Sequence, residues 1–169
     1  MTDMACKSNW KRWNGPALLL ALLAALVLAG CSSGPVRRVS EPSARIQQLT
    51  VRADGSWSAE LRIENFSSIP MRFESVDLAL KVADTAAGNL RAQPGLSIGP
   101  ESADIITVTV APQAAAKLAA ADALAAGRSL AYELNGRIDA TPDQGKLRSF
   151  EVERSSALSP APGLPGVLR

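Results

Sequence analysis

Apolar and polar residues alternate with a period of two through much of this chain, and the alternation begins near Ile46. It continues beyond the stretch ADGS, residues 53–56, through four alternate apolar positions: Trp57, Ala59, Leu61 and Ile63. Successive side chains of a β-strand point to opposite faces, so this period buries one face of a sheet and exposes the other. The Asp-Gly pair in residues 53–56 is typical of a hairpin turn. The sequence therefore predicts an antiparallel pair of strands.

The next apolar segment, residues 71–82, changes phase in its middle. Its apolar residues up to Phe73 alternate in one phase, and those from Val76 onward alternate in the other. A shift of one residue would turn half of the strand to the wrong face unless an extra residue forms a β-bulge. We therefore predict a bulge at Glu74 and Ser75.

Period-two alternation returns in three later segments, at residues 106–110, 130–138 and 146–154. Each is predicted to contain a strand. Residues 88–100 are interrupted by Gly and Pro, so they are expected to be irregular.

Residues 112–126 break the strand pattern, because they begin with proline, are rich in alanine and are followed by Gly127. Proline in the first turn and glycine past the last turn are start and stop signals of a helix. A low-complexity linker is the alternative, because the apolar stripe is weak. About seven strands and one α-helix at about 112–126 predict a mostly β fold. The expected architecture is an antiparallel β-sandwich of the immunoglobulin or fibronectin-III type.

The first thirty residues have the features of a bacterial export signal. A segment with three basic residues, Lys7, Lys11 and Arg12, precedes an unbroken apolar run at residues 17–28. A membrane-spanning helix would need about twenty apolar residues, whereas the run of twelve suits a signal peptide. A transmembrane anchor is therefore the less favoured alternative.

The apolar run ends in Leu28, Ala29, Gly30 and Cys31, which together resemble the lipobox of bacterial lipoproteins. The resemblance implies a diacylglyceryl group on the Cys31 sulfur, cleavage before this residue and acylation of the new amine, for example with palmitate. In enteric bacteria, an Asp directly after the lipidated cysteine resembles a signal for retention in the inner membrane. Ser32 stands at that position here, so the resemblance implies that the protein is anchored in the periplasmic leaflet of the outer membrane. Cys6 belongs to the discarded leader, which leaves Cys31 without a disulfide partner.

These features divide the chain into four predicted parts. Residues 1–30 form the signal peptide, and residues 31–44 form the lipidated N-terminus and a flexible tether rich in Ser, Gly and Pro. Residues 45–154 form the β-sandwich, and residues 155–169 form a Pro-rich, irregular tail. The 139 residues that remain after cleavage suit a single domain.

The mature part of the chain carries no excess charge. Of the eighteen basic and sixteen acidic residues, the leader contains Lys7, Lys11, Arg12 and Asp3, which leaves fifteen of each sign. No basic stripe with interleaved aromatic residues is present, so a nucleic-acid partner is not expected.

Enzymatic chemistry is also disfavoured by the composition. The chain contains no histidine, which excludes Ser-His-Asp and Cys-His catalysis and histidine-ligated metal sites. Glu151 and Glu153 would share one face of a strand, but Arg148 and Arg154 flank them as in an ordinary charged surface. A hard-cation site built from Asp and Glu alone stays open as an alternative, although no acidic loop of the Asp-x-Asp-x-Asp type is present. We predict no catalytic residue, no metal site and no cofactor.

Two segments resemble motifs of late embryogenesis abundant proteins of the second group and of the WHy (water stress and hypersensitive response) domain. Residues 61–82 match the family at Asn65 and at the pair Ile69 and Pro70, whereas Phe66 and Ser67 replace the usual Pro and Asn. Residues 130–140 resemble the family's Tyr-x-Leu-x-Gly strand through Tyr132, Leu134 and Gly136. The resemblance covers about residues 45–160 and implies a β-sandwich with a role in stress protection.

Each family-like residue also has a plain structural explanation. Asn65 can bond its own backbone and start a turn, and Pro70 presets the backbone at the start of a strand. Asn135 and Gly136 could form a hairpin turn, but the long alternation around them favours a glycine within a strand, where a neighbouring backbone needs room. Five aromatic residues are predicted in the core: Trp57, Phe66, Phe73, Tyr132 and Phe150.

The sequence predicts a membrane-anchored, non-enzymatic envelope lipoprotein that protects envelope components during desiccation or osmotic stress. The alternative is an adaptor lipoprotein whose edge strands or loops dock a partner in an envelope complex. The membrane is thus the expected partner, reached through the lipid. The sequence names no protein partner and does not fix the oligomeric state.

Overall fold

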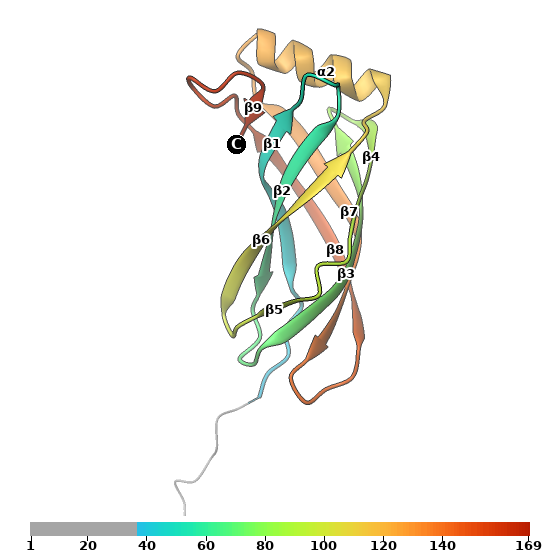
Figure 1. Cartoon of the computed structure of the whole chain (residues 1–169), viewed down its shortest axis with the longest axis vertical. Helices are drawn as coiled ribbons and strands as arrows, with labels where there is room; N and C mark the ends of the chain where they lie inside the picture. The colour runs from blue at the N-terminus through green and yellow to red at the C-terminus, as the bar shows by residue number, and fades with distance from the viewer. Residues whose placement is uncertain (1–36) are drawn as a thin grey trace, which may run out of the picture. The chain divides into compact units, whose positions relative to one another are not determined.

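The alternating segments form antiparallel β-strands in the computed structural model, which describes residues 37–169 (Figure 1). The predicted leader and the lipobox residues Leu28, Ala29, Gly30 and Cys31 lie outside the described residues. The described elements are β1 (Ser43–Val51), β2 (Trp57–Asn65), β3 (Met71–Val82), β4 (Thr85–Ala92), β5 (Leu96–Ile98), β6 (Ser102–Val110), α2 (Ala114–Ala125), β7 (Leu130–Pro142), β8 (Arg148–Leu158) and β9 (Val167–Leu168).

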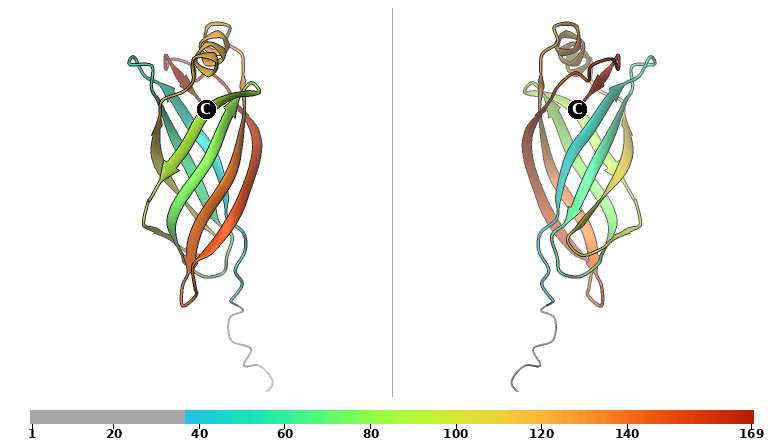
Figure 2. Two further views of the ribbon diagram at one scale, coloured as in Figure 1. Left: turned by 90° about the vertical axis from the view of Figure 1, so that its right-hand side faces the viewer. Right: turned by 90° about the vertical axis from the view of Figure 1, so that its left-hand side faces the viewer.

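The strands form two sheets that face each other across a common core (Figure 2). One sheet has the order β6-β2-β1-β9, and the other has the order β4-β3-β7-β8, with β5 paired to the first residues of β3. All pairings between these strands are antiparallel. The predicted antiparallel β-sandwich with one helix is confirmed. Seven of the described strands are long, and β5 and β9 add two short ones.

The core takes one face from each long strand. In β2 every second residue is buried, starting at Trp57 and ending at Asn65. Phe73, Tyr132 and Phe150 are also buried, as predicted. The prediction for Phe66 is wrong, because this side chain is 47% exposed. Asn65 takes the last inward position of β2, so the next residue along the chain points outward.

The predicted bulge in β3 is confirmed. The pairing with β7 shifts between Phe73 and Ser75, which leaves Glu74 as the extra residue. The shift lets Phe73 on one side and Val76 on the other both reach the core.

Most of the segment expected to be irregular forms β4 and β5, which pair with β3. Leu80 pairs with Gly88 and Lys81 pairs with Ala86, so Ala87 is an extra residue in β4. The buried residues Ala87 and Leu90 are therefore three positions apart. This spacing removes the period-two signal, which explains why the sequence pattern did not predict the strand.

The folded domain extends further at both ends than the sequence predicted. β1 begins at Ser43, within the predicted tether, and Ala44 is buried. In the predicted irregular tail, β8 continues to Leu158 and β9 pairs with β1. β9 was not predicted from the sequence, because two residues are too few to show a period.

The predicted helix α2 is confirmed over the linker alternative, and it packs on the core through Ala116, Ala120 and Ala123. It crosses one end of the sandwich, near the C-terminus (Figures 1 and 2). We call this the helix end. The opposite end, here called the loop end, comprises residues 37–41, 66–70, 99–101 and 143–147. Within residues 37–169, no helix has the length and hydropathy needed to cross a bilayer.

Candidate functional site

Asn65 is a buried amide that joins two loops at the loop end. Its Nδ2 lies 3.0 Å from the Ile69 carbonyl oxygen, 3.1 Å from that of Ile98 and 2.9 Å from that of Gly99. Its Oδ1 accepts a 2.9 Å hydrogen bond from the Ser67 backbone N–H. One side chain thus forms hydrogen bonds with backbone groups of the β2–β3 turn and holds the end of β5 against the end of β2.

Ser67 occupies a position where the family usually has Asn, and it too is buried. Its Oγ accepts a hydrogen bond from the Ser40 N–H at 3.0 Å and lies 3.0 Å from Met71 Sδ. The small hydroxyl therefore fastens the segment before β1 to the start of β3. Nearby, Ile69 packs inward, and the Pro70 carbonyl accepts a 2.9 Å bond from the Asp143 N–H.

The second motif lies along β7, away from Asn65. The Tyr132 hydroxyl accepts a 3.2 Å hydrogen bond from the Ile46 N–H, beside the irregularity in the β1–β2 pairing between Ile46 and Gln48. This bond satisfies a buried backbone donor on the facing sheet. Leu134 is a core residue.

Gly136 lies inside β7 rather than in a hairpin turn. It pairs with Leu78 of β3 on one side and with Val152 of β8 on the other. A Cβ at this position would overlap the Asp77 carbonyl oxygen and lie 3.0 Å from Leu78 Cα. The glycine is therefore explained by the close approach of β3, which is the strand interpretation made from the sequence.

The six described motif residues are not gathered in one cavity. Asn65, Ile69 and Pro70 lie in and beside the β2–β3 loop, and the other three are spaced along β7: Tyr132, Leu134 and Gly136. Their contacts hold loops and strands in place. The lipidation residue Cys31 lies outside the described residues.

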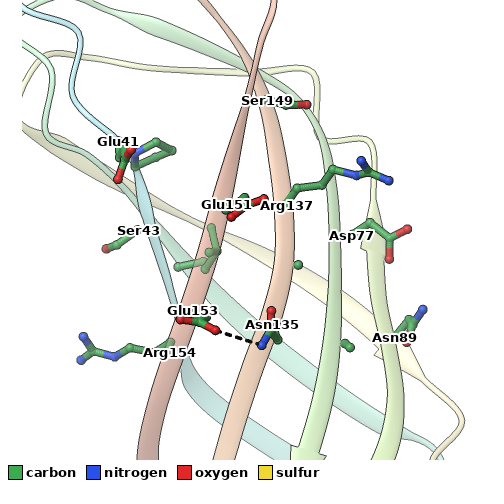
Figure 3. Close-up of a pocket in the computed structure, with 15 residues that line it drawn as sticks. Glu41, Ser43, Asp77, Asn89, Asn135, Arg137, Ser149, Glu151, Glu153 and Arg154 are labelled. Carbon is green, nitrogen blue, oxygen red and sulfur yellow. Dashed lines mark hydrogen bonds between the residues drawn. The ribbon is translucent and has the colours of Figure 1, made fainter.

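One hollow of the described residues, about 910 Å³ in volume, has mostly polar walls (Figure 3). Its walls come from the middle of β3, β7 and β8, from Asn89 of β4 and from residues 41–44. Asn135 donates a 3.4 Å hydrogen bond to Glu153 in this hollow. Aromatic side chains, which would stack on a flat ligand, are absent from its lining.

Charges of opposite sign face each other across the sheet that forms this hollow. Asp77 of β3 is opposite Arg91 of β4 on one side and Arg137 of β7 on the other, and Arg137 is in turn opposite Glu151 of β8. Arg91 Nε and Asp77 Oδ1 are 3.2 Å apart. This alternation of acidic and basic residues across neighbouring strands stabilises their pairing. It also leaves no cluster of charges of one sign that would attract a charged ligand.

Asp139 is the most heavily hydrogen-bonded carboxylate beside the hollow. It accepts hydrogen bonds from the hydroxyls of Ser149 and Ser75, the second at 2.7 Å. These two bonds, with Ser149 the stronger influence, lower the pKa of Asp139. A lowered pKa makes the carboxylate a weaker base, whereas a general base that activates serine needs a pKa nearer neutrality.

Glu64 is a second carboxylate held in its charged form. The hydrogen bond from Arg62 is the main cause of its lowered pKa, and the Ser43 hydroxyl also contributes. Arg45 lies 3.6 Å away on the neighbouring strand. This cluster joins β1 to β2 on the surface. Across residues 37–169, no group of three or more Cys, Asp or Glu residues is placed to hold a metal ion.

Two of these structural residues, Ser67 and Asp139, were not predicted from the sequence. Ser67 stands where the family motif is broken, so the motif comparison gave it no role. Asp139 has an isolated acidic side chain in the sequence, and its partners are 64 and 10 positions away. Only knowledge of the strand register could have identified them.

Comparison with known proteins gave one family. A family model described as late embryogenesis abundant protein (LEA_2) matches residues 60–155, more than half of the chain. No curated protein sequence gives a significant match.

Three solved structures illustrate what the chain is similar to. A protein from Arabidopsis thaliana is 14% identical, with 78% of this chain and 89% of that chain covered and a TM-score of 0.46. A protein from Bordetella pertussis is 11% identical, with coverage of 77% and 100% and a TM-score of 0.47. A protein from Archaeoglobus fulgidus is 12% identical, with coverage of 73% and 98% and a TM-score of 0.38.

Proposed function

Because the chain belongs to the late embryogenesis abundant (LEA_2) family, we propose that it is a non-enzymatic, stress-protective protein anchored to the bacterial envelope by lipid on Cys31. The observation that carries the protective role is the family match over residues 60–155, which runs from β2 to β8. Members of this family are generally non-enzymatic.

The chemistry of the described polar groups supports a role without catalysis. The buried polar side chains, Asn65 and Ser67, bond loops to one another. Asp139 has two serine partners, but its pKa is lowered, and the chain has no histidine to accept a serine proton. These groups act on the fold rather than on a substrate.

Protection would come from a folded surface that keeps its shape when water is scarce. Two ion pairs join adjacent strands on the outer face of the β4-β3-β7-β8 sheet, Arg91–Asp77 at 3.2 Å and Lys81–Glu133 at 3.7 Å. An unpaired charge depends on its hydration shell, whereas a paired charge keeps a partner when water is withdrawn. The domain would therefore persist as a polar, ordered layer beside the membrane.

The protective role is tested by drying a labile enzyme with the purified protein. We expect more enzyme activity after rehydration than with an equal mass of serum albumin. The matched variant is Asp77→Asn combined with Glu133→Gln, which removes both acidic partners from exposed positions. This variant should protect less well, and equal loss of enzyme activity with the native protein and with albumin would contradict the proposal.

The lipid anchor is tested by the substitution Cys31→Ser. The native protein should incorporate labelled palmitate, and the variant should incorporate none and remain uncleaved or mislocalised. Cys6→Ser is the matched control, because this second cysteine lies in the leader and should leave labelling unchanged. Palmitate labelling of the Cys31→Ser protein would refute the lipobox assignment.

The importance of the anchor is tested in cells under osmotic shock. Envelope integrity is compared in strains with the native protein, with the deletion, and with an exported form that has a soluble signal instead of the leader and Cys31. We expect the untethered form to rescue the deletion poorly. Full rescue by the untethered form would show that membrane placement is incidental.

An adaptor role is the second candidate, and one edge of the sandwich favours it. Among the described strands, β6 pairs only with β2, and it has Ile105 exposed on it. An open edge with an exposed apolar side chain can accept a strand from another protein. A stoichiometric partner recovered by crosslinking from membranes, and lost on Ile105→Lys substitution, would favour this candidate over stress protection.

A further inference from the structure

The N-terminal segment of the domain is fastened to the loop end. Arg37 Nη2 lies 3.2 Å from both the carbonyl oxygen and Oδ2 of Asp143, in the β7–β8 loop. The Arg38 N–H donates a 2.8 Å hydrogen bond to Ser68 Oγ, in the β2–β3 loop, and the Arg38 carbonyl accepts a 3.0 Å bond from the Ser68 N–H. The chain that precedes Arg37 therefore reaches the domain at this end.

The connection between Cys31 and the loop end is short. Six residue steps separate Cys31 from Arg37, and an extended chain covers about 3.5 Å per residue. A lipid on Cys31 would hold Arg37 within about 20 Å of the bilayer surface. α2 lies at the opposite end of the sandwich and so would point away from the bilayer (Figure 1).

Two large apolar side chains are exposed at the loop end. Phe66 in the β2–β3 loop is 47% exposed, and Leu147 before β8 is 60% exposed. The two loops are joined by the hydrogen bond from the Asp143 N–H to the Pro70 carbonyl. An aromatic ring and a leucine side chain are the groups that favour the boundary between headgroups and acyl chains.

Basic residues stand on both sides of Leu147. Lys146 and Arg148 are exposed and make no ion pair with any residue in the described chain. Of the acidic residues at the loop end, Asp143 lies 3.2 Å from Arg37 and Glu101 lies 3.8 Å from Arg38. Glu41 makes no ion pair within residues 37–169, and it lines the hollow of Figure 3. The two charges that flank Leu147 in the chain are thus both cationic and unpaired within the described residues.

We infer that the loop end rests on the headgroup layer of a bilayer that contains anionic phospholipid, with Phe66 and Leu147 inserted at its surface. Lys146 and Arg148 lie against lipid phosphates. This inference rests on the proposed lipid anchor, because the anchor brings this end to the membrane. Each of these two cations should strengthen the binding of the loop end to the anionic surface by about fivefold. The domain thus stands upright, with the helix end exposed to the periplasm.

The test uses the mature lipidated protein reconstituted in vesicles of phosphatidylcholine with phosphatidylglycerol. A nitroxide is placed at Leu147→Cys and, in separate proteins, at Phe66→Cys and at Leu118→Cys on the helix end, where the native leucine is 72% exposed. Collisions of the nitroxide with oxygen, which is enriched in the bilayer, are compared with collisions with a water-soluble nickel complex.

The ratio of oxygen collisions to nickel collisions should be several times higher for the labels at positions 147 and 66 than for the label at position 118. Adding Lys146→Glu and Arg148→Glu to the protein labelled at position 147 should reduce this ratio toward that of position 118. Equal ratios at all three positions in protein that floats with the vesicles would overturn the membrane contact and leave the anchor intact. Protein that does not float with the vesicles would overturn the anchor and with it this inference.

Discussion

Asn65 shows how much of the loop end depends on one side chain. It is buried, and its amide meets three carbonyl oxygens from two separate segments of the chain while its Oδ1 accepts a backbone N–H. A buried carbonyl that loses its donor costs about 1–3 kcal/mol. Asn65 thus has a structural role in the fold, which does not depend on any function of the protein surface.

Replacing Asn65 by Ala is expected to lower the free energy of unfolding by about 3 kcal/mol or more, because three carbonyls and one N–H lose their partner. Urea unfolding of a soluble form that begins at Ser32 measures the change. Asn135→Ala is the matched control, since Asn135 is exposed and makes a long hydrogen bond at 3.4 Å. Similar losses in the two variants would contradict the role given to Asn65.

Asp139 provides a prediction of pH dependence. Hydrogen bonds from Ser149 and Ser75 hold the pKa of Asp139 below its usual value of about 4. The ionised form therefore stabilises the folded protein above about pH 4, and this contribution is lost as the pH falls through the lowered pKa. Asp139→Asn should unfold more easily than the native protein at pH 7, and the difference should shrink below pH 4.

The measurement is the free energy of unfolding of both proteins between pH 7 and pH 3, together with the NMR titration of the Asp139 carboxyl carbon. Ser149→Ala is the control, because it removes the main cause of the shift and should raise the pKa of Asp139. An Asp139 carboxyl that titrates at the usual value in the native protein would contradict this account.

At the scale of elements, β7 is a central strand of the β4-β3-β7-β8 sheet. It pairs with β3 and with β8 along almost its whole length, so both of its edges are used. Its Tyr132 also bonds β1 in the facing sheet. A defect in the middle of β7 would therefore disturb both neighbours at once.

Gly136→Ala is expected to destabilise the domain by about 1–3 kcal/mol, because the added methyl group meets the backbone of β3 and neither strand can move without losing its pairing. Thermal unfolding followed by circular dichroism measures the effect. Gly99→Ala is the matched control, since its nearest contact would be Ser102 Oγ at 3.7 Å. That variant should stay within about 0.5 kcal/mol of the native protein.

At the scale of the whole molecule, the two ends of the described chain are both built into the fold. Residues 37–40 bond to the loops at one end, and β9 pairs with β1 at the other. The Arg169 backbone N–H also bonds the Ser159 carbonyl, which closes the C-terminal segment on β8. The tail therefore contributes to stability, contrary to the irregular tail predicted from its prolines.

Leu168→Ala is expected to lower the free energy of unfolding by about 2–5 kcal/mol, because Leu168 is completely buried between β1 and the C-terminal segment. Leu164→Ala is the matched control, since Leu164 belongs to the same tail but is 46% exposed. Urea unfolding should place the second variant within about 0.5 kcal/mol of the native protein. Equal effects would show that β9 adds little to the core.

The sequence by itself determined the class of fold, the hairpin turn at residues 53–56, the bulge in β3, the helix and most of the core. These features depend on local periodicity and on turn and helix signals, which are written in contiguous residues. The tertiary structure alone decided the partners of Asn65 and Asp139, the short strands β5 and β9, and the placement of the loops that carry Phe66 and Leu147 at the same end of the sandwich. Each of these depends on which distant segments become neighbours, and that follows from the pairing of strands and the closing of the sandwich rather than from any local pattern.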